Sequence, residues 1–277
     1  MAKRAVKKPM YSMGVRRGLA TSVSLLLILF SLTLVSTIVY TYALNRIANG
    51  KQNLRLVAAQ EKMIDVDEAI SAVAWSPGSI QTLAFSDYGG SLRVVNASNP
   101  LQLNLTMDGS TYTVFDSDTG SYLYELPSTS SGMYGRWIRG DERAIVNQSS
   151  AYQTQMSVGA GDERQELVAR YRPIVTQSVG GLSSGRRIND FRVYIVNLNG
   201  SQSIDSSGEF HIRVRCESVA TPLYSYDLDA SVTTLSVTAD LDGEQRTLNL
   251  HITTGPLGST ANIELVISYV NIEGVEI

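Results

Sequence analysis

The chain contains one long apolar stretch. Between Arg17 and Arg46 there is no charged residue, and the apolar part is 26 residues long, from Leu19 to Leu44. A helix needs roughly 20 residues to cross about 30 Å of hydrocarbon, whereas the apolar core of a signal peptide has roughly 7–15 residues. The pattern therefore predicts a transmembrane helix over residues 19–45.

A one-sided apolar pattern follows in residues 51–74. A Gly inside a helix lowers helix stability by about 1 kcal/mol relative to Ala. Asn49-Gly50 therefore leaves two options: one helix that extends to about residue 75, or two helices that join near Gly50. Ser76-Pro77-Gly78 ends the helix because Pro cannot continue it. We predict an amphipathic helical stalk over residues 46–76. Its apolar residues recur every three or four positions and are Leu54, Val57, Ala58, Met63, Ile64, Ile70, Val73 and Ala74.

Beyond Gly78 the apolar period changes to two, which is typical of strands. Asp108-Gly109 and Asp242-Gly243 are hairpin-turn dipeptides. The predicted fold class is α+β: a long N-terminal hydrophobic helix followed by an antiparallel β-rich, sandwich-like ectodomain. We divide the ectodomain into a first β region, 79–135, and a C-terminal β-sandwich-like region, 160–277. The predicted strands are Ser79–Phe85, Leu92–Val95, Leu101–Thr106, Thr111–Phe115, Tyr122–Leu126, Tyr152–Val158, Glu166–Thr176, Phe191–Leu198, Glu209–Val219, Thr233–Asp240, Arg246–Thr253 and Ile263–Val270.

Charge is distributed unevenly along the 277 residues. Six of the 23 basic residues lie in residues 1–18, which contain no acid, whereas the rest of the chain carries 17 bases and 26 acids. By the positive-inside rule, residues 1–18 form a cytoplasmic basic leader and the acidic β region lies outside the cell. This indicates a single-pass protein of the cell membrane that contacts membrane lipid. The acidic body argues against nucleic acid as a partner.

The residues that usually carry chemistry do not form a convincing site. His211 and His251 alternate with apolar residues in predicted strands, which indicates exposed strand side chains. Gly181–Gly185 matches G-x-S-x-G around Ser183, but a strand and no helix follows it, so we interpret it as a loop. Asp116–Gly120 and Asp240–Glu244 have the composition of hairpin turns. We therefore expect no catalytic residues, no bound metal and no cofactor, and the protein is not expected to be an enzyme.

The single cysteine and four sequons complete the candidate sites. In the predicted strand Glu209–Val219, Cys216 shares a face with Phe210, Ile212 and Val214, so we expect an inert core thiol. N-x-S/T triplets begin at four positions that are possible glycosylation sites on the outer side of the membrane. They are Asn96, Asn104, Asn147 and Asn199.

The leader resembles a known class of signal. Arg16-Arg17-Gly18, directly followed by a retained apolar helix, resembles the class III signal peptide of archaeal type IV pilin-like proteins. The ectodomain is similar to archaeal pilin-like, single-span surface proteins at Ala74-Trp75-Ser76-Pro77-Gly78-Ser79, Tyr124-Glu125-Leu126-Pro127 and Tyr171-Arg172-Pro173. Where many pilins carry Glu at the fifth residue after the glycine, this chain has Val23.

The resemblance implies processing and assembly. A prepilin peptidase would cut after Gly18, with Arg16 and Arg17 before the cut and Leu19 as the first mature residue. The chain would then be a subunit or minor component of a surface filament, contacting other pilin-like subunits through its N-terminal helix. One alternative is a monomeric membrane-anchored surface protein with an adhesive or ligand-binding β domain. Another is an anchored extracellular enzyme whose site would require a pocket converging on Ser183 or on the Asp clusters.

Overall fold

The computed structural model describes residues 15–86, 88–127, 135–147, 151–160, 164–200, 203–204 and 209–275. The chain forms two compact units, Met1–Gln52 and Asn53–Ile277. Most of the predicted leader, residues 1–14, lies outside the described residues. The helix is α1 (Val15–Val73). The strands are β1 (Ile80–Ser86), β2 (Ser91–Met107), β3 (Ser110–Pro127), β4 (Trp137–Arg139), β5 (Thr154–Ala160), β6 (Arg164–Tyr171), β7 (Ile174–Ser183), β8 (Arg186–Asn199), β9 (Ser203–Ile204), β10 (Glu209–Ala220), β11 (Leu223–Leu228), β12 (Thr234–Leu241), β13 (Glu244–His251) and β14 (Ser259–Val275).

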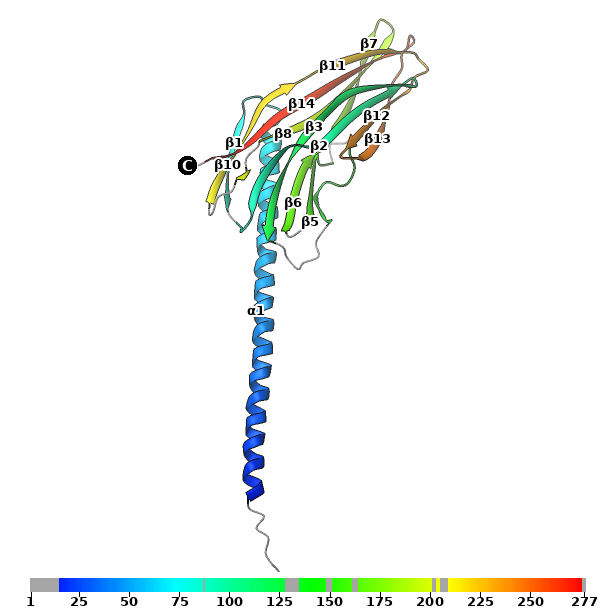
Figure 1. Cartoon of the computed structure of the whole chain (residues 1–277). Coiled ribbons are helices and arrows are strands. Elements are labelled where there is room, and N and C mark those ends of the chain that lie inside the picture. Colours follow the sequence, from blue (N-terminus) through cyan, green and yellow to red (C-terminus); the bar gives the residue numbers. More distant parts are fainter. Residues whose placement is uncertain are drawn as a thin grey trace, which may run out of the picture. The chain divides into compact units, whose positions relative to one another are not determined.

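The helix is continuous through Asn49-Gly50, so of the two options the structure has one helix and not two joined helices (Figure 1). It ends just before the predicted Pro-Gly stop. Its last carbonyl oxygens, which lack partners within the helix, accept hydrogen bonds from Ser79 and Cys216. Ser79 Oγ lies 3.0 Å from the carbonyl oxygen of Val73, and Cys216 Sγ lies 3.3 Å from that of Ala74. Gly78 then turns the chain with a φ of 81°, a conformation that favours glycine.

One sheet has the strand order β1-β10-β14-β8-β7, with β11 also paired to β14. The expected antiparallel pairing holds for its other strand pairs, but β14 and β8 pair in parallel from Ser259↔Arg187 to Asn271↔Asn199. The chain between these strands forms β10 and β11 of the same sheet and β9, β12 and β13 of the other sheet before it returns as β14. A return of this kind makes two neighbouring strands parallel.

The other sheet has the order β13-β12-β2-β3-β6-β5-β4, with β9 also paired to β2, and all its pairs are antiparallel. The predicted hairpins at Asp108-Gly109 and Asp242-Gly243 are confirmed, since they join β2 to β3 and β12 to β13. The four short strands predicted between residues 92 and 126 are two long ones, β2 and β3, which carry bulges. Asp116–Gly120 therefore lies within β3 and not in a turn.

Strands from the two predicted β regions share both sheets. In the first sheet β1 pairs with β10, and in the second β2 pairs with β12. Residues 53–277 form one compact unit, to which both regions contribute strands. The predicted strand Glu166–Thr176 is also two strands in different sheets, β6 and β7, because the chain crosses between the sheets at Arg172-Pro173.

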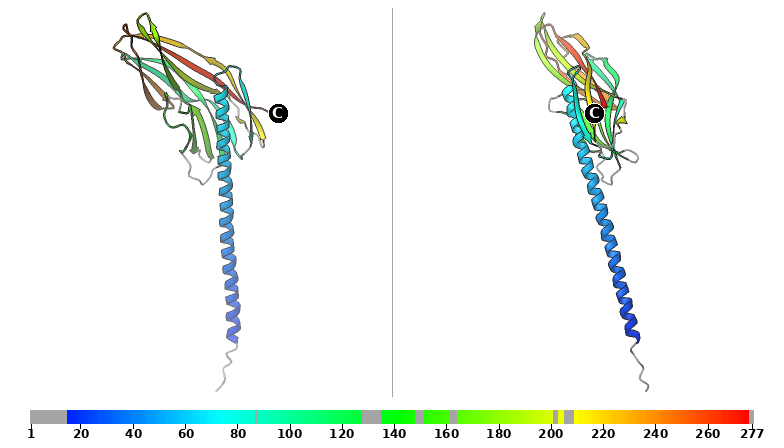
Figure 2. Two further views of the ribbon diagram at one scale, coloured as in Figure 1. Left: turned by 180° about the vertical axis from the view of Figure 1, so that it is seen from behind. Right: turned by 90° about the vertical axis from the view of Figure 1, so that its left-hand side faces the viewer.

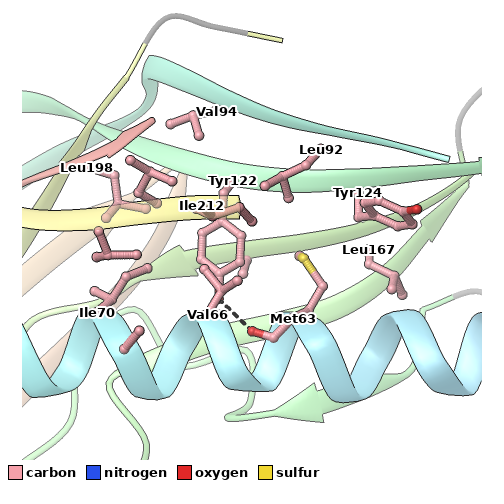
Figure 3. Close-up of a cluster of buried hydrophobic side chains, with 14 of the residues drawn as sticks. Met63, Val66, Ile70, Leu92, Val94, Tyr122, Tyr124, Leu167, Leu198 and Ile212 are labelled. Carbon is pink, nitrogen blue, oxygen red and sulfur yellow. Dashed lines mark hydrogen bonds between the residues drawn. The ribbon is translucent and has the colours of Figure 1, made fainter. Parts of the chain in front are cut away.

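Two hydrophobic clusters fill the space between the sheets. The helix cluster joins residues 56–74 of the helical segment to parts of both sheets, and it includes Tyr122, Leu167 and Ile212. The sheet cluster joins the other ends of the long strands without the helix. Figure 2 shows the upper part of α1, light blue to cyan, running beside the strands in both views. In Figure 3, Met63, Val66 and Ile70 point from α1 toward the strands, where Leu92, Leu198 and Ile212 lie.

Candidate functional site

The first candidate site is the apolar segment of α1, residues 22–47. Its large apolar side chains are exposed on every side of the helix; Leu29 is 56% exposed and Phe30 64%. Within the described residues, α1 is the one helix long and apolar enough to cross a membrane, and none of its most apolar part is buried. An apolar helix of this kind is consistent with membrane anchoring.

Hydroxyl groups in this segment are hydrogen-bonded within the helix. Ser31 Oγ donates to the carbonyl oxygen of Ile28 at 2.9 Å, and Thr37 Oγ1 donates to that of Thr33 at 2.8 Å. Thr41 Oγ1 reaches the carbonyl oxygens of Thr37 and Ile38, each at 2.9 Å. These bonds satisfy the hydroxyl donors without a partner outside the helix, so the segment tolerates its polar residues in an apolar medium.

The predicted processing residues lie in the first turns of α1. Arg16, Arg17, Gly18 and Leu19 all have helical backbone, since α1 begins at Val15. Cleavage after Gly18 stays a prediction, and the backbone places the expected cut inside regular helix.

The second candidate site is the helical segment 53–73, which buries one face against the β strands. Leu56 is 1% exposed, and Met63 and Ile70 are fully buried. The predicted face was partly wrong, because Leu54 is 72% exposed and Val57 50%. Apolar residues occupy both faces between positions 54 and 58, so spacing alone could not select the face that contacts the sheets.

A buried carboxylate lies on this face. Asp67 is 2% exposed. Its oxygens accept hydrogen bonds from Tyr171 Oη at 2.6 Å, from Arg139 Nη1 at 2.6 Å and from Thr154 Oγ1. Arg139 Nη2 also contacts Glu68 Oε1 at 2.7 Å. The donors come from β4, β5 and β6, so one charged group ties the helix to three strands.

Two tyrosines surround the same carboxylate. Tyr122 Oη donates to the carbonyl oxygen of Met63 at 3.2 Å, which Figure 3 marks as a dashed line. Burial raises the pKa of Tyr122 and of Tyr171 well above the usual tyrosine value, and the charge of Asp67 adds to the effect. Both phenols therefore stay neutral and serve as hydrogen-bond donors.

A second buried charge lies where the chain crosses from β6 to β7. The Arg172 side chain is fully buried, and its Nη1 lies 2.6 Å from Asp141 Oδ1. Arg143 forms a further ion pair with Asp141 at 2.7 Å. Hydrogen bonds from Arg143 and from Arg172 hold the pKa of the Asp141 carboxyl well below its usual range.

Two open cavities lie on the β unit. One, of about 310 Å³, is bordered by Ile138, Arg139, Gly140, Asp141, Arg143, Val146, Asn147, Ala151 and Tyr152. The other, of about 410 Å³, is bordered by Thr176, Gln177, Ser178, Asp190, Phe191, Arg192, Leu223, Asn262 and Glu264. Neither is bordered by Ser183 or by the predicted Asp clusters.

The structure places the predicted chemistry-bearing residues apart. Cys216 is fully buried on the face shared with Phe210, Ile212 and Val214, which confirms the predicted core position. Ser183 is exposed at the end of β7, beside a hairpin turn and not at a strand-to-helix elbow. Among the described residues, no three His, Cys, Asp or Glu side chains gather closely enough to hold a metal ion.

The candidate glycosylation residues have different surroundings. Asn96, Asn147 and Asn199 are exposed, and Asn96 lies in the bulge of β2. Asn104 is half-buried within the sheet, where its Oδ1 accepts a hydrogen bond from Thr113 Oγ1 at 2.7 Å. Its Nδ2, the atom to which a glycan would be attached, donates to Gln102 Oε1 at 3.1 Å. The middle and last residues of the Asn147 sequon, and the last residue of the Asn199 sequon, lie outside the described residues.

Sequence reasoning missed Asp67, Arg139, Thr154 and Asp141. Asp67 had a usable signal, because it is an acid that follows Val66 among the apolar positions of an amphipathic helix. Its partners had none, since Arg139 and Thr154 are 72 and 87 residues away in the chain.

Comparison of the chain with protein-family models, with curated proteins and with solved structures gives no match.

Proposed function

We propose that this protein is a pilin-like subunit or minor component of an archaeal cell-surface filament. In this proposal it enters the cell membrane as a single-pass protein, with its N-terminus in the cytoplasm and its β unit outside the cell. Its role is structural and not catalytic: the apolar helix is stored in the bilayer and later packs among like helices.

The observation that carries the proposal is the division of one continuous helix into two kinds of surface. Residues 22–47 expose apolar side chains all round, whereas residues 53–73 bury one face within the β unit. A helix that is apolar on all sides needs lipid or other apolar helices around it. The helix is unbroken through Gly50, and this continuity favours a filament subunit over a surface domain on a flexible tether.

The leader supports the same proposal. A prepilin peptidase that cuts between Gly18 and Leu19 would remove all six leader bases. Their removal matters because unpaired charges are costly to bury in a bundle of apolar helices. The sequence around the cut supplies Arg16 and Arg17 before a residue without a side chain, which gives a peptidase close access to the backbone.

One observation favours a plain single-pass anchor as the second candidate. No charged residue lies between Arg17 and Arg46, and Val23 stands where a carboxylate would pair with the new amino group at Leu19. Without that pair, a neighbouring subunit in a bundle would have no charged contact to fix its register. In this second candidate the helix only anchors the protein, and the β unit is the adhesive or ligand-binding part.

The test is N-terminal mass spectrometry of the full chain, expressed in an archaeal host that has a prepilin peptidase. We expect the wild-type protein to begin at Leu19 and the Gly18→Val variant to retain its leader. Gly50→Val is the matched control, since a side chain at Gly50 meets nothing within 4 Å, and its N-terminus should be that of the wild type. Mature surface protein that still begins near Met1 would overturn the filament proposal and leave the plain anchor.

Assembly can be tested on the same protein. Because Cys216 is fully buried, a single cysteine introduced by Leu29→Cys is the only accessible thiol in the described residues. In sheared surface filaments we expect this variant to form disulfide-linked dimers through neighbouring helices. Processed protein that stays uncrosslinked and is never found in filaments would contradict assembly while leaving processing intact.

A further inference from the structure

The wall of the smaller cavity, of about 310 Å³, is held in place by the buried guanidinium of Arg172. Arg172 Nη1 donates to the carbonyl oxygen of Arg143 at 3.0 Å, and its Nη2 donates to that of Tyr152 at 2.8 Å. The same side chain bonds Asp141, so the donors of one fully buried guanidinium hold two wall segments together. Burying an arginine is costly unless its donors are well paired. Here the pairing fixes the loop that borders the cavity.

Two further residues fix this loop from the strand side. Gln155 Nε2 donates to the carbonyl oxygens of Asp141 at 2.7 Å and of Arg143 at 3.0 Å. Gly140 has a φ of 73°, and a Cβ there would lie 2.3 Å from the carbonyl oxygen of Thr154. The loop therefore lies close against β5, and the cavity is formed before any ligand arrives.

The charges that border the cavity are already paired. Arg139 is bound to Asp67 and Glu68, and Arg143 is bound to Asp141. An ion would have to displace one of these partners to find an opposite charge. The cavity therefore offers hydrogen-bonding groups more than net charge, which favours a neutral ligand.

The remaining surface combines an aromatic ring with planar polar groups. Tyr152 is 56% exposed, and the Arg139 guanidinium lies 5.3 Å from the centre of its ring. The exposed amide of Asn147 and the carboxylate of Asp141 border the same cavity. The Asn147 amide can both donate and accept hydrogen bonds, whereas the Asp141 oxygens already accept five hydrogen bonds from Arg143 and Arg172.

We propose that this cavity, the Tyr152 cavity, binds a neutral saccharide. Sugar hydroxyls both donate and accept, which matches the Asn147 amide, and the apolar C–H face of a sugar ring packs on an aromatic ring such as Tyr152. Its volume of about 310 Å³ lies at the lower end of the range of about 300–1,000 Å³ for ligand sites, which fits one or two sugar rings. A free oligosaccharide and the end of a surface glycan share this chemistry.

The test is saturation-transfer NMR on the full chain, held in micelles of a detergent without a sugar headgroup. The probes are glucose, galactose, mannose, N-acetylglucosamine and their disaccharides, titrated to about 10 mM, well above a Kd of about 1 mM. We expect saturable transfer from at least one sugar. Tyr152→Ala should weaken that binding by about tenfold or more, because it removes the exposed aromatic contact, and Tyr152→Phe should retain it.

Controls separate this cavity from other surfaces. Tyr112→Ala removes a tyrosine that is 43% exposed outside the cavity, and it should bind as the wild type does. Asn262→Ala alters the larger cavity and should also leave binding unchanged. Retention on an immobilised polymer of the bound sugar would identify a surface glycan as the source, whereas binding of the free sugar without retention would identify a soluble one.

The proposal would be overturned by the absence of saturable transfer from every sugar, by equal binding of Tyr152→Ala and the wild type, or by loss of binding in Asn262→Ala alone. Competition by inorganic sulfate would also contradict a neutral ligand, because it would show that a charged group in the cavity is free.

Discussion

Residues 22–47 and residues 53–73 belong to one helix, but their apolar side chains are arranged differently. In the first segment every face is apolar and exposed, with Leu29 at 56% and Ile47 at 68%. In the second, Met63 and Ile70 are fully buried while Val57 on another face is 50% exposed. The second segment thus has its apolar partner within its own chain, whereas the first must find lipid or another helix.

Polar groups differ between the segments in the same way. Hydroxyls in the first segment bond to carbonyl oxygens one turn back, as Thr37 does to Thr33. In the second, Asp67 bonds to three strands. Self-contained hydrogen bonds leave a helix free to exchange one apolar environment for another, whereas a buried charge fixes one particular contact.

The largest expected effect comes from a charge on the buried face. Ile70→Asp should destabilise the β unit by about 4 kcal/mol or more, because it places an unpaired carboxylate in the helix cluster. Val57→Asp, a β-branched residue replaced on the exposed face, should change the free energy of unfolding by about 0.5 kcal/mol or less. Urea unfolding measures both variants, and equal destabilisation would show that the face is assigned incorrectly.

Removing the buried carboxylate should have the next largest effect. Asp67→Ala leaves the hydroxyls of Tyr171 and Thr154 without this acceptor and Arg139 with Glu68 alone, a loss of about 3–5 kcal/mol by analogy with broken buried ion pairs. Asp65→Ala removes the exposed pair with Lys62, and such pairs contribute at most about 1 kcal/mol. Denaturant melts of the two variants give the comparison. A loss below about 1 kcal/mol in Asp67→Ala would mean that the cluster does not hold the helix.

A charge in the first segment should affect the membrane and not the β unit. Leu29→Arg adds a cost of about 2.5–3.5 kcal/mol for insertion near the bilayer centre. Leu54→Arg makes the same change at a site 72% exposed outside the apolar segment and should insert normally. Membrane fractionation reports insertion, and the thermal melting of the β unit should be unchanged in both variants. A lower melting temperature in Leu29→Arg would contradict the assignment of residues 22–47 to the membrane and of residues 53–73 to the β unit.

The smallest expected effect is a pH dependence of stability that comes from Asp141, which lies outside the helix. The folded pKa of Asp141 is lowered by Arg143 and Arg172, so its contribution to stability is complete above the unfolded pKa of about 4. That contribution declines as the pH falls below about 4 toward the folded pKa. Asp141→Asn should therefore be less stable than the wild type at neutral pH, and the difference should shrink in acid. Melting temperatures of both proteins across this pH range provide the measurement, and a constant difference would contradict the assignment.

The sequence by itself determined the features that depend on local patterns. The uninterrupted apolar run of residues 19–44, the stop at Ser76-Pro77-Gly78, the two Asp-Gly hairpins and the inward face of Cys216 all follow from neighbours within a few residues. Helices and strands repeat about every 3.6 and 2 residues, so such features can be predicted from the sequence without knowledge of the fold.

Only the tertiary structure decided which distant residues meet. It chose the helix face at Leu56 over that at Leu54, paired β8 with β14 in parallel, and merged the two predicted β regions into shared sheets. It also brought Arg139 to Asp67 and buried Arg172 behind a cavity. These outcomes depend on strand order and on the desolvation of charges between elements far apart in the chain, and neither leaves a periodic signal in the sequence.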